Sequence, residues 1–172
     1  MPMMPIWHAM AEMPVLEVSI ADPRWEAMGF DAICQKAAIA ALTVAGLPSA
    51  GIEISILATD DAEMTRLNGA FRDKQAPTNV LSWPSEERSA DHPGGTPRPP
   101  LDLEIGDIAL GFETCEREAC ENGVGIHQHV THLVLHGILH LLGYDHISDE
   151  DATLMEGLEI QALERLGIAN PY

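Results

Sequence analysis

The chain has 172 residues, of which 46% are hydrophobic and 21% charged, so it can bury the core of one domain and is too apolar for a disordered protein. Its formal net charge is −18, with only nine Lys and Arg residues, which argues against an extended basic surface for nucleic acid. A phosphate-binding site must therefore be local and small, or a partner must deliver the nucleic acid. Alternatively, the acidity only keeps the protein soluble.

The sequence shows no feature of a membrane or secreted protein. No apolar run reaches the roughly 18 residues that a membrane-spanning helix needs. Residues 1–13 lack the cationic flank and the apolar core of a secretory signal. Three cysteines, Cys34, Cys115 and Cys120, form an odd number without framework spacing, so we expect reduced thiols in a cytoplasmic protein.

The first half of the chain predicts two strands and two helices in alternation. Their expected bounds are 15–20 for the first strand, 24–44 for the first helix, 52–57 for the second strand and 60–68 for the second helix. Apolar residues at every second position indicate the strands. Asp22 and Pro23 give the first helix an N-cap and a proline at its first position, and Asp60 with Glu63 forms a capping box that opens the second.

The second half predicts two more strands, a long loop and three helices. Their expected bounds are 79–83 and 102–110 for the strands, 85–100 for the loop, and 112–122, 126–142 and 149–166 for the helices. Strands interleaved with helices, without a repeat or a linker, predict one α+β domain of mixed α/β type. We expect a small mixed four-stranded sheet packed with about five helices over residues 14–168, preceded by a flexible N-terminal extension, residues 1–13.

Four histidines recur on the long helix expected over 126–142, at spacings of three, four and four, so they lie on one stripe. They are His129, His132, His136 and His140. His136 and His140 can reach one ion together, and His146 follows on a loop that can fold back over the same ion. Three imidazoles with an open fourth position are typical of a catalytic zinc site, which acidifies water or polarises the bond under attack. Nickel and copper also accept imidazole, and ordinary core or surface histidines are the alternative.

The same histidine offsets occur in the H-E-x-x-H-x-x-G-x-x-H pattern of metzincin metalloproteases. The glutamate that serves those enzymes as general base is replaced here by Gly137, which cannot accept a proton. Asp145, beside the third ligand, could act as the base or orient His146, and we favour the orienting role. His132, one turn before the first ligand, could orient a ligand, face a phosphate or lie on the helix surface.

Residues 132–146, H-L-V-L-H-G-I-L-H-L-L-G-Y-D-H, resemble the signature H-x-x-V-H-G-x-L-H-L-x-G-Y-D-H of the YbeY endoribonucleases. Further resemblances occur at 67–72 and 77–84, at the L-G-D-I-like strand 105–108 and at the closing M-x-x-L-E helix, 155–167. The resemblance implies a zinc-dependent, single-strand-specific endoribonuclease that matures ribosomal RNA, notably at the 3′ end of the small-subunit RNA, and acts in ribosome quality control. It departs from the family's pattern at Asn79, where Asp is frequent, so we assign that residue no role.

The resemblance also implies residue roles. The family's zinc ligands carry over to His136, His140 and His146, and its functionally important arginine carries over to Arg72. Without the resemblance Arg72 reads as a solvated or salt-bridged arginine; with it, a phosphate clamp is favoured, because a guanidinium donates two parallel hydrogen bonds to phosphate. We therefore take Arg72 and Asp145 as candidate catalytic residues and one Zn²⁺ per chain as cofactor. The expected partners are single-stranded and ribosomal RNA and the ribosome or its proteins, but neither DNA nor a membrane.

Two alternatives remain open. The first is a metal-dependent hydrolase of another substrate, including peptides, against which Gly137 weighs. The second is a non-catalytic, zinc-containing ribosome biogenesis factor, which the acidic charge favours because ribosomal proteins are basic. Against the second, only three strong ligands are visible, whereas structural zinc normally has four.

Overall fold

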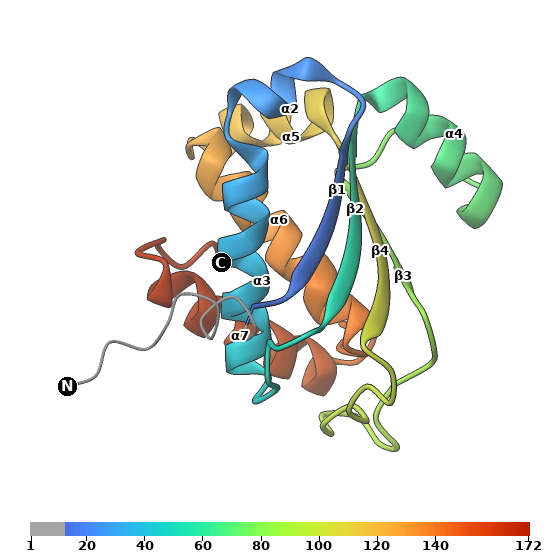
Figure 1. Ribbon diagram of the computed structural model, residues 1–172, viewed down its shortest axis with the longest axis vertical. Helices are drawn as coiled ribbons and strands as arrows, with labels where there is room; N and C mark the ends of the chain where they lie inside the picture. Colours follow the sequence, from blue (N-terminus) through green and yellow to red (C-terminus); the bar gives the residue numbers. More distant parts are fainter. Residues whose placement is uncertain (1–12) are drawn as a thin grey trace.

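Four strands and six helices make up residues 13–172, the part of the chain that the computed structural model describes (Figure 1). The strands are β1 (Val15–Ile20), β2 (Glu53–Thr59), β3 (Val80–Pro84) and β4 (Glu104–Gly111). The helices are α2 (Pro23–Ala27), α3 (Phe30–Val44), α4 (Asp61–Arg72), α5 (Phe112–Glu121), α6 (Ile126–Leu141) and α7 (Asp149–Arg165). The expected α+β domain with a mixed sheet is confirmed, while the expected extension lies outside the described residues apart from Met13.

The sheet has the order β1-β2-β4-β3, so β3 is an edge strand. The neighbours β1, β2 and β4 run parallel, and β3 pairs antiparallel with β4 in a register that sets Ser82 opposite Ile108. Helices α3 and α6 cover one face of the sheet, and α4 lies beyond the other face at one end (Figure 1). Because side chains alternate along a strand, β3 presents Ser82 to α6 and its neighbour Trp83 to the opposite face.

The prediction of one helix over 24–44 is wrong in one respect, because the structure has two helices there, α2 and α3. Gly29 has a φ of 72°, a left-handed conformation that glycine adopts without steric penalty and that interrupts the helical hydrogen bonds. The break allows Trp25 to turn inward, where its indole N–H donates to the carbonyl of Thr59 at 2.7 Å. Its ring also packs on Phe30, with ring centroids 4.7 Å apart. Tertiary packing of one tryptophan thus overrides the helical tendency of this Ala-rich segment.

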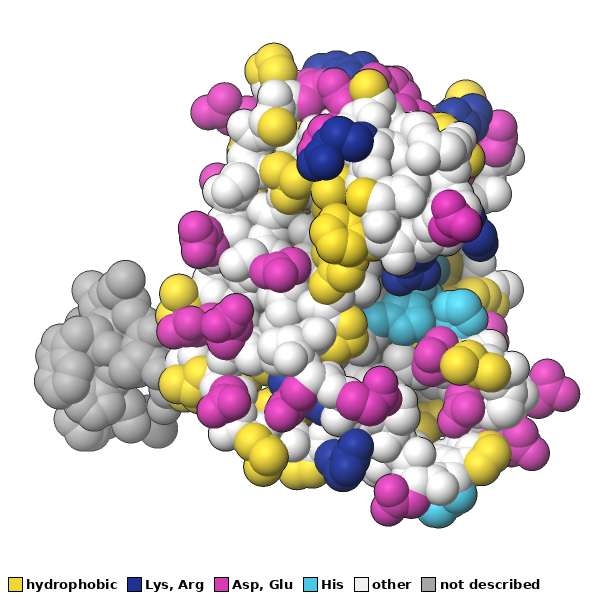
Figure 2. Space-filling model, turned by 90° about the vertical axis from the view of Figure 1, so that its right-hand side faces the viewer, with side chains coloured by type: hydrophobic (Ala, Val, Ile, Leu, Met, Phe, Trp, Pro, Cys, Tyr) yellow, Lys and Arg dark blue, Asp and Glu magenta, His cyan; other side chains and the backbone are white. Residues whose placement is uncertain are grey.

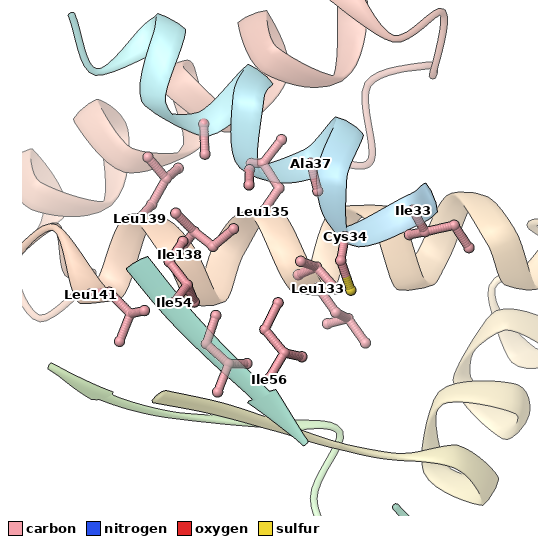
Figure 3. Packing of buried hydrophobic residues seen from close by; sticks show 14 of the residues in the cluster. Ile33, Cys34, Ala37, Ile54, Ile56, Leu133, Leu135, Ile138, Leu139 and Leu141 are labelled. Carbon is pink, nitrogen blue, oxygen red and sulfur yellow. The ribbon is translucent and has the colours of Figure 1, made fainter. Parts of the chain in front are cut away.

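Helix α6 lies between α3 and the sheet and is the centre of the hydrophobic core. Ile138 of α6 lies beside Ile54 of β2, while Leu135 lies on the side of α3 (Figure 3). Together with Leu139 and Ile56 they are fully or almost fully buried in one core. Burying each such side chain stabilises the fold by about 1.5–3 kcal/mol. This packing fixes the rotation of α6 about its axis and leaves its histidine-bearing stripe only partly buried. Among residues 13–172, no helix is long and apolar enough to cross a membrane.

Candidate metal centre

Three histidines meet where α6 ends. His136 and His140 are one turn apart on α6, and His146 returns toward them from the following loop, so that one nitrogen of each ring lies within 4.8 Å of the others. The Nε2 atoms of His136 and His140 are 3.0 Å apart. The histidines form a patch in a hollow of the molecular surface (Figure 2). The structure therefore brings together the three ligands that the sequence predicts, with no other protein ligand joining this group within the described residues.

The other nitrogen of each α6 ring has its own acceptor. Nδ1 of His140 donates to the carbonyl of Tyr144 at 3.0 Å, and Nδ1 of His136 is hydrogen-bonded to the carboxylate of Glu159. These contacts place the proton on Nδ1 and leave the lone pair on Nε2, where the two rings face each other. Metal-binding histidines are held in this way by carbonyls and carboxylates. The donor set therefore fits a borderline-soft cation such as zinc.

Glu159 of α7 is a site residue that the sequence reasoning missed. Its carboxylate is fully buried and bonded to His136, to Nε2 of His132 at 3.3 Å and to the hydroxyl of Tyr172. Burial alone raises the pKa of Glu159, but the hydrogen bonds from His132 and His136 outweigh it and lower the pKa to about 2. Glu159 is thus a buried anion behind His132 and His136. The glutamate of the M-x-x-L-E motif was the signal that could have identified it.

His132 and His129 each contact a carboxylate outside the group of three histidines, and His132 shares the Glu159 carboxylate with His136. His132 contacts Glu159, which supports an orienting role rather than a place on the helix surface. His129 bonds through Nε2 to Glu118 of α5 at 2.8 Å, and the amide of Asn79 donates to the same carboxylate at 3.0 Å. This chain of contacts joins α6, α5 and the start of β3. Asn79 thus helps to fix the strand that forms one wall of the site.

The environment of His140 favours its neutral form. Burial lowers the pKa of His140 to about 4, the neighbouring His136 and His146 act in the same direction, and Asp145 opposes them. At neutral pH the ring therefore offers its Nε2 lone pair to a cation without first losing a proton.

The turn after α6 depends on Gly143 and on the loop between β3 and β4. Gly143 has a φ of 100°, and a Cβ atom there would lie 2.8 Å from the carbonyl oxygen of Arg88. A side chain at this position would both strain the backbone and collide with the loop. The glycine therefore allows the chain to reverse closely enough for His146 to reach the cluster.

Arg88 binds this loop to the end of α6. The sequence did not predict this role, because the composition of a loop does not indicate which arginine is buried. The residue is only 2% exposed. Its Nη1 donates to the carbonyl of Leu141 at 2.8 Å, and its Nη2 donates to Oγ of Ser85 at 2.9 Å and pairs with Glu86 at 3.2 Å. Its Nε has no hydrogen-bond partner among the described residues. Arg88 thus satisfies an otherwise unpaired carbonyl at the helix end and anchors the loop beside the histidines.

All five candidate site residues from the sequence line one cleft of about 370 Å³. They are Arg72, His136, His140, Asp145 and His146. Arg72 is exposed in the last turn of α4, which is one turn longer than predicted and ends at Asp73, whose φ is 54°. The carboxylate of Asp145 accepts a hydrogen bond from the backbone N–H of His146 at 2.8 Å, and no described contact joins it to the ring of that histidine.

Positive charge is scarce but present at this cleft. On α4, Arg66 is paired with Glu63 at 2.6 Å, whereas Arg72 forms no ion pair with any residue of 13–172. One Lys or Arg side chain lies directly above the histidine patch, and acidic side chains are scattered over the remaining face (Figure 2). Arg72, which lines the cleft, therefore stands where an anionic ligand would approach the histidines.

Position 137 is closed to the glutamate of the metalloprotease pattern. Gly137 is buried against the sheet, and a Cβ atom there would lie 3.2 Å from both Cδ1 of Ile108 and Oγ of Ser82. A larger side chain would separate α6 from β3 and β4, and it would start from the sheet side of the helix rather than from the cleft. The peptidase alternative therefore lacks its general base for structural as well as chemical reasons.

An open cleft with three histidines at its floor, in an α+β domain, defines the chain as a candidate metal-dependent hydrolase. The sequence matches the model of the family described as endoribonuclease YbeY over residues 21–167, and the chain belongs to this family. It is 50% identical to an endoribonuclease YbeY of Dinoroseobacter shibae over 162 residues, which cover 91% of this chain and 90% of that protein. It is 52% identical to an endoribonuclease YbeY of Ruegeria pomeroyi, also over 162 residues, with coverage of 91% and 97%.

The fold also matches a solved structure. The solution structure of TM1509 from Thermotoga maritima superimposes with a TM-score of 0.54 at 19% sequence identity, covering 89% of this chain and 92% of that one. At this identity the match supports the fold alone.

Proposed function

We propose that this protein is a zinc-dependent endoribonuclease that cleaves single-stranded RNA during maturation of ribosomal RNA. The observation that carries the proposal is the facing pair of Nε2 atoms of His136 and His140, in one cleft with the unpaired Arg72. The naming of its relatives as endoribonucleases supports the choice of RNA as substrate. The acidic net charge is compatible with this choice because phosphate binding at one site needs only a local cation, and the unpaired Arg72 lines the cleft.

His136, His140 and His146 would hold the ion. When bound, zinc supplies Lewis acidity, which makes water a better nucleophile at neutral pH and polarises a phosphate oxygen. Glu159 and the carbonyl of Tyr144 keep the two α6 rings in the orientation and tautomer that this role requires. Arg88 and Gly143 keep the loop that carries His146 against the end of α6.

Arg72 would bind the scissile phosphate. Its guanidinium can donate two hydrogen bonds to one phosphate, and the absence of an ion pair within residues 13–172 means that no carboxylate must be displaced first. The same bonds stabilise the negative charge that grows on the phosphate oxygens during attack. Arg72 therefore acts on binding and on the transition state together.

Asp145 would have two roles. One oxygen of its carboxylate accepts the backbone N–H of His146 and so steadies the loop of the third ligand. The carboxylate also lines the cleft, where it can accept a proton from the attacking water. This proton acceptor takes the place of the protease glutamate that Gly137 excludes.

The finer assignment follows the family: cleavage near the 3′ end of the small-subunit ribosomal RNA, a role in ribosome quality control, a cytoplasmic location, and the ribosome or its basic proteins as partners. The acidic surface supports a basic protein partner by charge complementarity. A non-catalytic zinc factor is the weaker alternative, because the three histidines lack a fourth protein ligand within the described residues, as a catalytic site requires.

The test is cleavage of a ribosomal RNA fragment by protein of known metal content. We expect the single-stranded fragment to be cut, the same fragment annealed to its complement to be spared, and cutting to stop with a chelator and return with zinc. No cleavage by zinc-replete protein would favour the non-catalytic factor. Turnover of casein instead of RNA would revive the peptidase alternative.

A further inference from the structure

The last turn of α4 carries an exposed aromatic ring directly before the proposed phosphate-binding arginine. Phe71 is 64% exposed, and no residue of 13–172 covers its outer side. Single exposed apolar side chains are common on protein surfaces, so exposure alone assigns no role. The neighbours of Phe71 and its place relative to the cleft decide its interpretation.

The ring of Phe71 packs against a second aromatic ring, that of Trp83. The ring centroids of Phe71 and Trp83 are 5.5 Å apart in an edge-to-face arrangement with an interplanar angle of 69°. Trp83 belongs to β3 and lies on the face of the sheet opposite the histidines. The two rings border a groove of about 460 Å³, which Leu57 and Leu67 also line. The pair is therefore a rigid aromatic surface open to solvent.

This aromatic surface and the metal cleft lie on opposite faces of β3, and neighbouring residues of α4 line each of them. Phe71 and Arg72 are consecutive on α4, so their side chains point about 100° apart around the helix. Arg72 lines the cleft of the histidines, and Phe71 lines the groove on the other face of the sheet. The end of α4 thus spans the edge strand. A hydrophobic patch beside the Lys or Arg side chain above the histidines is visible on this side of the molecule (Figure 2).

We propose that Phe71, supported by Trp83, is a stacking site for an unpaired base of the RNA, next to the phosphate that Arg72 binds. The inference rests on the proposed function, because it takes RNA to be the ligand of the cleft. Single-stranded RNA exposes its bases, which stack on aromatic side chains largely independently of sequence. A base held in a duplex cannot turn onto the ring, so the same site selects single strands.

The charges around the groove agree with a base rather than a phosphate at the rings. Arg72, the residue after Phe71, lines the cleft and has no ion pair within the described residues. Glu17 and Asp107 line the remainder of the groove and disfavour a phosphate there. The backbone of the RNA therefore stays at Arg72, and only the uncharged base extends over Phe71.

The test is single-turnover cleavage by the metal-loaded protein, using single-stranded ribosomal RNA fragments in which one base at a time is replaced by an abasic site. We expect wild type to need about tenfold more protein for half-saturation when the missing base flanks the scissile phosphate. Phe71→Ala and Phe71→Leu should bind the intact RNA about tenfold more weakly and should no longer respond to the missing base. Phe71→Tyr keeps the aromatic face and should behave as wild type.

Leu101→Ala is the matched control, since Leu101 is an apolar side chain that is 87% exposed and lines neither the cleft nor the groove. Metal content, and the maximal rate at saturating protein, should stay unchanged in all Phe71 variants. If Phe71→Ala and Phe71→Leu respond to every abasic position as wild type does, the proposal is overturned, and the rings belong to a protein contact instead. The same assay records whether wild type cleaves intact RNA. A failure of the stacking proposal, with wild type still cleaving, is therefore distinct from a failure of the nuclease assignment.

Discussion

Nε2 of His136 and Nε2 of His140 face each other at 3.0 Å, while both Nδ1 atoms are held by acceptors, Glu159 and the Tyr144 carbonyl. With both protons placed on Nδ1, two lone pairs point at one another. This arrangement is unfavourable unless a cation lies between the rings or one ring takes up a proton. The α6 histidines are thus oriented for a ligand before it arrives, and the buried carboxylate of Glu159 is the group that holds the first of them.

The substitution Glu159→Gln should weaken zinc binding while keeping the shape of the site. Glutamine can still accept one hydrogen bond, but it removes the negative charge that lies behind His136 and favours a cation at its Nε2 atom. We expect a loss in zinc affinity of about 10–100-fold, measured by competition with a chelator of known affinity. Glu164→Gln, an exposed position on the same helix, is the control. Equal affinities for both variants and wild type would remove Glu159 from the account.

The metal-free protein should lose stability as the pH falls from about 6.5 to about 4. His140 has a pKa of about 4 in the folded protein against an ordinary value of 6.5, so the unfolded chain binds more protons between these values. The contribution of His140 is therefore complete above pH about 6.5 and lost as the pH falls toward 4. Each pKa unit corresponds to about 1.4 kcal/mol, so the loss is up to about 3 kcal/mol. Denaturant unfolding across this pH range measures it.

A His140→Gln variant separates this effect from other titrations. Its unfolding free energy should vary less between pH 6.5 and 4 than that of wild type. Below pH about 4.5 both proteins should still weaken, because the pKa of Glu159 is lowered to about 2 and its protonation disrupts the contacts with the histidines. A wild-type curve that is flat from pH 6.5 to 4 would contradict the lowered pKa of His140.

Replacing Arg88 should loosen the loop next to the third ligand. Arg88→Met keeps the length of the side chain but removes the bonds to Leu141 and Ser85. Losing these bonds from a cationic donor and leaving a buried carbonyl unpaired should lower the free energy of unfolding by about 2–4 kcal/mol. We also expect faster proteolysis of residues 85–100 and weaker zinc retention. Arg98→Met removes only a solvent-exposed hydrogen bond of the same loop, to the carbonyl of Glu87 at 3.1 Å, so it should change stability, proteolysis and zinc retention much less. Similar behaviour of the two variants would contradict the anchoring role.

Most of the fold could be predicted because its signals are local. The alternation of apolar and polar residues, the N-caps and the glycines at helix ends predict every strand and all but one of the breaks between helices. The predicted bounds differ from the observed ones by a few residues. The exception is the division between α2 and α3 at Gly29, which depends on Trp25 reaching the carbonyl of Thr59. That contact joins residues 34 positions apart, and local propensity carries no information about it.

In the candidate site, too, local contacts could be predicted from the sequence and distant ones could not. His136, His140 and His146 lie within eleven residues, so helix geometry and one glycine sufficed to predict that they meet. Glu159 reaches His136 from another helix, and only its place in the M-x-x-L-E motif distinguishes it from an ordinary charged residue of that helix. Arg88 reaches Leu141 across 53 positions from a loop. Residues that contact the histidines from other elements are brought there by tertiary packing. The spacing of residues in a single sequence does not predict such contacts.

The most direct test of the account measures zinc content and RNA cleavage together in wild type, Arg72→Ala, Arg72→Lys and His140→Ala. We predict that wild type binds one zinc and cleaves single-stranded ribosomal RNA, and that His140→Ala loses both. Arg72→Ala should keep its zinc and lose about 100-fold or more in cleavage rate, and Arg72→Lys should recover only part of it, because lysine cannot form the two parallel hydrogen bonds. Full cleavage by Arg72→Ala, or cleavage by zinc-free His140→Ala, would contradict the account.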